Sequence, residues 1–158
     1  MRKVIFAEFI AILALAGVMF LLLYKKDPKD VSLTDVDDMF IRSFSTEGME
    51  PARDMRFKRS YGLNAADYDE VLYYVPDNTM SVNEFLIVKC FDTTDTADVV
   101  SACEGRIVAQ KRSFDGYGTN QTALLNQAEL YVSGQYVCLF VSEHAAEWLS
   151  AVKKVWGE

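Results

Sequence analysis

The sequence predicts an α+β domain with a four-stranded, mainly antiparallel sheet and helices on one face, preceded by one transmembrane helix. Three observations support this prediction: an apolar run near the N-terminus, strand-like segments that come in two pairs, and a helical pattern after each pair. The repeated order strand-strand-helix is compatible with an internal duplication. The chain has 158 residues, of which 51% are hydrophobic and 25% charged, and this composition is typical of a folded chain.

The apolar run at residues 4–24 contains a single charge, Glu8. As a helix that rises about 1.5 Å per residue, it would be about 31 Å long, which matches a bilayer core of about 30 Å. The run continues past Ala14-Leu15-Ala16, where a signal peptide could end. Val18 stands where a lipoprotein would carry its lipidated cysteine. We therefore expect an uncleaved anchor.

The predicted domain organisation follows from this anchor. Arg2 and Lys3 favour a cytoplasmic N-terminus, although lysines at positions 25, 26 and 29 make the charge difference across the span small. We expect a cytoplasmic tail at residues 1–3, the anchor at 4–24, a linker at 25–30 and an extracytoplasmic domain at 31–158. The expected location is the cell membrane, with a single span and the domain outside the cytoplasm.

The first half of the domain is predicted to contain one helix and two strands. Apolar residues recur at helical spacing from Leu33 to Phe44, and Gly48 with Pro51 ends the helix. Residues 71–75 and 85–91 are rich in β-branched and aromatic residues, which favours two strands. A long helix then runs from about Asp95 to about Arg112.

The second half is predicted to repeat the order of strand, strand and helix. A glycine-containing loop at 114–118 leads to a short helix at 119–127. Residues 129–132 and 136–141 form a hairpin around Ser133-Gly134, a sequence typical of tight turns. Ser142 caps a last helix, in which Trp148 and Trp156 fall on the apolar face.

The charge balance of residues 31–158 argues against nucleic acid as a partner. This part contains 11 Lys or Arg and 20 Asp or Glu, a net charge of −9. Nucleic-acid binding needs a basic surface, which so acidic a domain does not offer overall.

The sequence predicts no metal site, cofactor site or catalytic residue. Cys90, Cys103 and Cys138 form no paired motif, so zinc has no support, and we expect buried thiols, although two of them could join outside the cytoplasm. His144 is the only histidine and lies on an amphipathic helix. The three aspartates at positions 92, 95 and 98 lack the glycine and glutamate of a calcium loop, and helix capping explains them better.

Two short basic stretches stand out in this acidic domain. Arginines and a lysine at positions 53, 56, 58 and 59 precede Tyr61, and Lys111-Arg112 precedes Phe114 and Tyr117. If the stretches meet in the fold, they could hold a phosphate or carboxylate group. The candidate anion-binding residues are Arg56, Arg59, Tyr61, Lys111, Arg112 and Tyr117. The other interpretation is a solvated face whose cations pair with nearby acids.

Two segments resemble an uncharacterised bacterial family, known only as a domain of unknown function. One begins at Tyr61-Gly62-Leu63-Asn64, and the other contains Phe114-x-Gly116-Tyr117-Gly118. The resemblance spans about residues 56–156. The family occurs in lipid- or helix-anchored extracytoplasmic proteins of Gram-positive bacteria, so the resemblance implies one domain outside the membrane. It implies no activity and no catalytic residue.

The function expected from the sequence is that of a non-catalytic binding or interaction module at the outer face of a membrane. Its partner would be a protein or another envelope component. One alternative is a hydrolase of an envelope polymer, which would need two carboxylates converging in a cleft. Another is an accessory subunit of a membrane complex, which would expose an apolar patch.

Overall fold

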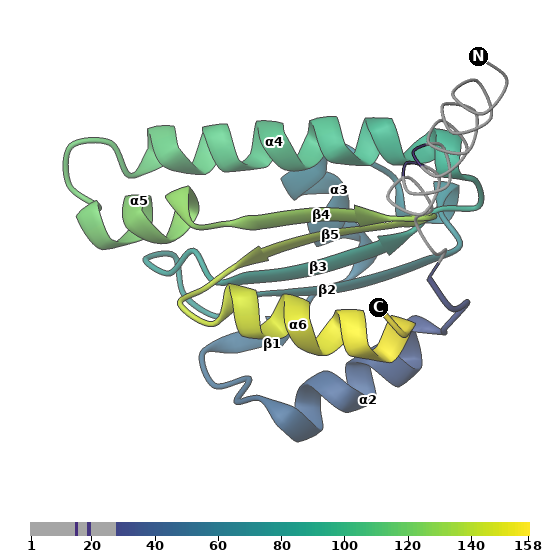
Figure 1. Cartoon of the computed structure of the whole chain (residues 1–158). Helices are drawn as coiled ribbons and strands as arrows, with labels where there is room; N and C mark the ends of the chain where they lie inside the picture. The colour runs from purple at the N-terminus through teal and green to yellow at the C-terminus, as the bar shows by residue number, and fades with distance from the viewer. Residues whose placement is uncertain (1–14, 16–18, 20–27) are drawn as a thin grey trace, which may run out of the picture.

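The computed structural model describes residues 28–158, together with Leu15 and Met19. These residues form an α+β fold with a five-stranded antiparallel sheet, in the strand order β1-β2-β3-β5-β4, and helices on both of its faces (Figure 1). The strands are β1 (Met49–Pro51), β2 (Glu70–Pro76), β3 (Glu84–Lys89), β4 (Glu129–Ser133) and β5 (Tyr136–Val141). The helices are α2 (Leu33–Ser43), α3 (Asp54–Tyr61), α4 (Thr96–Ser113), α5 (Thr119–Asn126) and α6 (Ala145–Trp156), with short 3-10 turns at Ala65–Asp67 and Thr93–Asp95.

The number of strands corrects the prediction of a four-stranded sheet. The additional strand is β1, which pairs only with β2 and therefore lies at the sheet edge. It has three residues and contains Pro51, so it shows no strand pattern in the sequence. An edge strand tolerates proline because one of its sides makes no ladder hydrogen bonds.

The placement of helices on one face of the sheet is also wrong. Helices α3, α4 and α5 cover one face, and α2 and α6 cover the other (Figure 1). The reason lies in β3 and β5, whose residues are all buried, so that neither strand has a face left for solvent. Trp148 and Trp156 pack against the second face from α6, as their helical spacing predicts.

The predicted transmembrane helix is not supported. None of the helices in the described part of the chain is long and apolar enough to cross a membrane. The predicted span at 4–24 lies outside the described residues, apart from Leu15 and Met19, and so do the tail at 1–3 and residues 25–27 of the linker.

The segment that enters the domain, residues 28–33, is tied to the sheet by polar contacts. The Lys89 ammonium lies 2.9 Å from carboxylate oxygens of both Asp30 and Asp69. The Tyr136 hydroxyl accepts a hydrogen bond from the Val31 N–H and donates one to the Val31 carbonyl, each at 2.9 Å. Glu70 accepts the N–H of Leu33 at 2.9 Å, at the start of α2.

Candidate binding cleft

The connection between β2 and β3, residues 77–83, is held in shape by its own side chains. Asn78 Oδ1 accepts the N–H groups of Met80 and Ser81, at 3.0 and 2.9 Å. The Ser81 hydroxyl accepts the Asn83 N–H at 3.2 Å. Asparagine and serine favour such turns because their side chains replace backbone partners. We call residues 77–83 the cleft loop, after the cavity beside it. The loop is also bonded to α5, because Gln121 Nε2 donates a hydrogen bond to the Met80 carbonyl at 2.9 Å.

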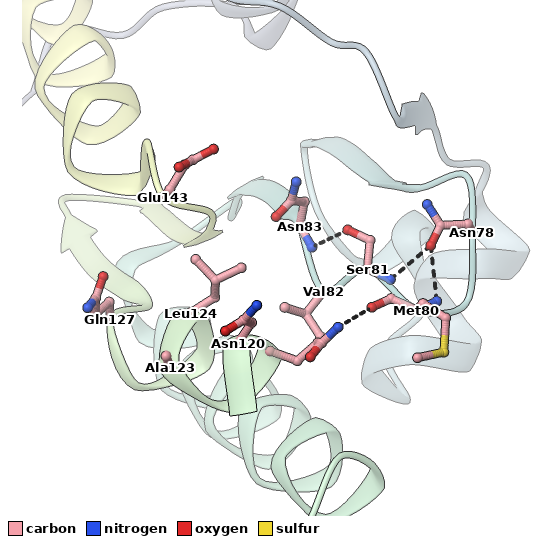
Figure 2. A pocket seen from close by; sticks show the side chains of 11 residues that line it. Asn78, Met80, Ser81, Val82, Asn83, Asn120, Ala123, Leu124, Gln127 and Glu143 are labelled. Atoms are coloured by element: carbon pink, nitrogen blue, oxygen red, sulfur yellow. Dashed lines mark hydrogen bonds between the residues drawn. The ribbon is translucent and has the colours of Figure 1, made fainter. Parts of the chain in front are cut away.

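A cavity of about 590 Å³ opens between the cleft loop, α5 and the turn that precedes α6 (Figure 2). We call it the amide cleft, because five of its lining side chains are amides. Its lining residues are Asn78, Met80, Ser81, Val82, Asn83, Asn120, Gln121, Ala123, Leu124, Gln127 and Glu143. This volume falls within the range of about 300–1,000 Å³ that is usual for small-molecule sites.

Three amides of the cleft are available to a ligand. The side chains of Asn83, Asn120 and Gln127 make no hydrogen bond to any residue that the structure describes. Each offers two N–H donors and a carbonyl acceptor. Glu143 is the only acid among the described lining residues, and its carboxylate lies 3.8 Å from His144 Nε2.

The apolar part of the cleft is formed by Met80, Val82, Ala123 and Leu124. Figure 2 shows Val82, Leu124 and Asn120 close together around the middle of the cleft, with Asn83 and Glu143 on one side of them. Val82 is buried, with 1% of its surface exposed. No lysine, arginine, histidine, cysteine or aromatic ring is found among the described residues that line the cleft. The cleft therefore suits a neutral group that carries both hydrogen-bonding and small aliphatic parts.

A second hollow, of about 510 Å³, lies between edge strand β1 and helix α3. We call it the arginine groove. Arg53, Arg56 and Arg59 line it: Arg53 is the residue just before α3, and the spacing of three residues places Arg56 and Arg59 on neighbouring positions of the helix. Its other lining residues are Glu50, Pro51, Ala52, Met55 and Val75.

A smaller hollow of about 270 Å³ has lining residues in common with both, and we call it the joining hollow. It shares Arg56 with the arginine groove and shares Asn78 and Ser81 with the amide cleft. Arg106 and Tyr117 also line it. The three hollows are therefore neighbours along one side of the cleft loop.

The structure brings together some of the predicted anion-binding residues. Arg56 and Arg59 line the arginine groove together, and Arg56 and Tyr117 line the joining hollow. Lys111 and Arg112 line none of the three hollows. Tyr61 is buried and belongs to a different cluster.

That cluster surrounds Glu84, which is completely buried at the start of β3. Glu84 Oε1 accepts the hydroxyls of Tyr61 and Tyr73 at 2.7 and 2.6 Å, and Oε2 accepts the Gln110 amide at 2.7 Å. Arg106 Nε lies 3.2 Å from Oε2. Burial, followed by the Glu84 charge, raises the pKa of both tyrosine hydroxyls above their usual value.

The sequence did not indicate Glu84 or the amides of the cleft, and Arg53 belonged to the basic stretch but not to the candidate anion-binding residues. Glu84 directly precedes the apolar residues of β3, a position at which an acid would be expected at the surface. Its partners are 11 to 26 positions away in sequence. The cleft amides extend from Asn78 to Gln127 without a recurring motif. Only the arginines formed a visible local pattern.

Other predictions about chemistry can now be placed. Cys90, Cys103 and Cys138 are free and buried, as expected for structural thiols. Within the described residues, no group of three or more His, Cys, Asp or Glu side chains could hold a metal ion. Asp92 accepts the N–H of Thr94 at 2.9 Å, so it caps the turn at Thr93–Asp95.

The fold and the hollows define an α+β domain with a polar surface cleft. Residues 42–142 match a family described as a domain of unknown function, DUF4358, and the chain belongs to this family. The expected resemblance to an uncharacterised family is thereby confirmed, while a Gram-positive origin and an anchored context are not shown. No curated protein and no solved structure matches the chain.

Proposed function

We propose that the domain is a non-catalytic binding module, which holds an extended, uncharged peptide segment of a partner protein in the amide cleft. The observation that carries this proposal is the set of unpaired amides, Asn83, Asn120 and Gln127, beside an aliphatic surface. The expected extracytoplasmic location stays a prediction from the sequence, and the peptide proposal does not depend on it.

A peptide matches this lining better than the other neutral polymers do. Its backbone carries an N–H donor and a C=O acceptor in every residue, which are the groups that amide side chains bind. Small side chains of the peptide could contact Ala123 and Leu124, which are both less buried than Val82. A carbohydrate would be better served by an aromatic ring against its C–H face, and no such ring lines the described cleft.

The lining favours binding over hydrolysis. The envelope hydrolase that the sequence left open would need two converging carboxylates, but Glu143 has no second acid beside it among the described lining residues. Ser81 is no better placed as a nucleophile, because its hydroxyl accepts the Asn83 N–H and no histidine, lysine or second base lines the described cleft.

Calorimetric titration of the full-length chain with capped tetra-alanine tests the proposal. We expect weak binding, and we expect Asn83→Ala and Asn120→Ala each to weaken it about fivefold, because one net hydrogen bond contributes about 1 kcal/mol. Asn126→Ala is the matched control, since Asn126 is exposed on the same helix as Asn120 and does not line the cleft.

Three outcomes would contradict the peptide proposal. They are no heat of binding with tetra-alanine, equal affinities for the control and both cleft variants, and tighter binding of the neutral sugar chitotriose. The last result would identify the cleft as a carbohydrate site.

A further inference from the structure

The arginine groove contains cations that the domain does not use for its own stability. Arg53, Arg56 and Arg59 are exposed, and none of them forms an ion pair with a carboxylate of the described chain. In contrast, Arg106 is bound to buried Glu84 and Lys89 lies among three acids. The three arginines are set apart by their clustering, because Lys58 and Arg112 also form no ion pair within the described chain but line none of the three hollows.

The lining of the arginine groove has both an apolar part and a cationic part. Pro51, Ala52 and Val75 provide an apolar part of the lining, and the three guanidinium groups provide donors. A guanidinium group can bind a carboxylate with two parallel hydrogen bonds. Glu50 is the only acid among the described residues that line the groove, against three arginines, so the lining carries a net positive charge.

From this arrangement we propose that the peptide held in the amide cleft continues into acidic residues, whose carboxylates bind Arg53, Arg56 and Arg59. This inference rests on the proposed function, because it extends the peptide of the amide cleft past the joining hollow, whose lining residues are shared with both sites. Arg56 lines both the groove and the joining hollow, so it would meet the first acidic residue beyond the cleft.

An acidic peptide suits the groove better than an anionic membrane surface does. The net charge of −9 over residues 31–158 repels an extended anionic surface. A short acidic peptide segment inside the groove would lie close to the three arginines. Salt would screen its repulsion from acids of the domain that lie more than about 8–10 Å away. Vesicles that contain anionic lipid therefore serve as a competing probe.

The experiment compares peptides of equal length that share a tetra-alanine half. The second half is Glu-Glu-Glu in one peptide and Gln-Gln-Gln in the other, and both orders of the two halves are made. We expect one order of the acidic peptide to bind the full-length chain about tenfold more tightly than its glutamine counterpart at low salt. The difference should largely disappear near about 0.5 M salt, because the screening length is shorter at high ionic strength.

Variants on α3 assign the effect to the groove. Arg56→Gln and Arg59→Gln should each reduce the advantage of the acidic peptide by about threefold and leave the affinity for the glutamine peptide unchanged. Lys58→Gln is the control, because it removes an exposed cation from the same helix that lines neither the groove nor the joining hollow.

The outcomes separate this inference from the proposed function. Equal binding of the acidic and glutamine peptides would overturn the acidic extension alone. If Lys58→Gln reduced the advantage of the acidic peptide as much as the arginine variants do, the inference would also fail, because net charge alone would then explain the effect. Binding to phosphatidylglycerol vesicles that is lost in Arg56→Gln, without a preference for the acidic peptide, would assign the groove to lipid. If neither peptide bound, the proposed function itself would fail.

Discussion

Glu84 fixes the residue at which the cleft loop becomes strand β3. Its carboxylate has partners from α3, β2 and α4, namely Tyr61, Tyr73, Arg106 and Gln110. Burying a carboxylate is costly unless such partners compensate the lost water. The contacts therefore join three elements at the end of the loop that supplies Asn78 and Asn83 to the cleft.

The first prediction at this scale concerns stability. Replacing Glu84 by alanine should lower the free energy of unfolding by about 3–5 kcal/mol, because it leaves the Arg106 charge and two tyrosine hydroxyls without their buried acceptor. Urea denaturation measures the change. Glu143→Ala is the control, and an exposed acid of this kind should change stability by no more than about 0.5 kcal/mol. Equal stabilities for Glu84→Ala and the native chain would show that the cluster does not hold the loop.

At the scale of elements, the entering segment depends on one cation in a central strand. Burial disfavours the charged form of Lys89, but hydrogen bonds to Asp30 and Asp69 outweigh burial and raise the pKa of the ammonium group. The Lys89 hydrogen bond, followed by its charge, lowers the pKa of the Asp30 carboxyl. Both shifts favour the ionised pair over a wide range of pH.

The sign of the pH dependence follows from these directions. The pKa of Asp30 is lower in the folded protein than in the unfolded chain. Its contribution to the free energy of unfolding is therefore present above the ordinary pKa of about 4 and is lost as pH falls through the lowered pKa. The pKa of Lys89 is raised on folding. Its contribution to the free energy of unfolding is therefore present below the ordinary pKa of about 10.4 and is lost as pH rises through the raised pKa.

We therefore predict that Lys89→Met lowers the melting temperature by about 5 °C at neutral pH, and that this difference shrinks below about pH 4. The amide proton of Val31 should also exchange faster in the variant, since residues 28–33 lose one of their attachments. Asp38→Asn removes an exposed ion pair with Arg42 on α2, and its effect should be near zero. A pH-independent loss in Lys89→Met would mean that packing of the lysine stem, and not the ion pairs, attaches the segment.

The sequence predicts elements well where the pattern is long and regular. The strands expected at 71–75 and 85–91 correspond to β2 and β3, and the last helix corresponds to α6. Helix α3 was missed, because Arg53 to Arg59 reads as a basic stretch and only Phe57 and Tyr61 give it an apolar side. The second layer of helices was missed because apolar runs in β3 and β5 do not show which elements cover them.

The whole molecule is organised around the two hairpins β2–β3 and β4–β5, which join through the antiparallel pairing of β3 with β5. This topology places the cleft loop, α5 and Glu143 around one opening. The amides of the cleft come from two segments, 78–83 and 120–127, that are 37 positions apart at their nearest, so their convergence depends on strand order. Neither the sheet edge at β1 nor this convergence could be derived from local patterns.

NMR shift mapping on the full-length chain with capped tetra-alanine shows directly whether the amide cleft binds a neutral peptide. We expect saturable shift changes to concentrate in the cleft loop at 77–83 and in α5, including the side-chain amides of Asn83, Asn120 and Gln127. Signals from α2, on the opposite face of the sheet, should stay unchanged. Shifts that concentrate outside the cleft, or an unchanged spectrum at millimolar peptide, would contradict peptide binding in the amide cleft.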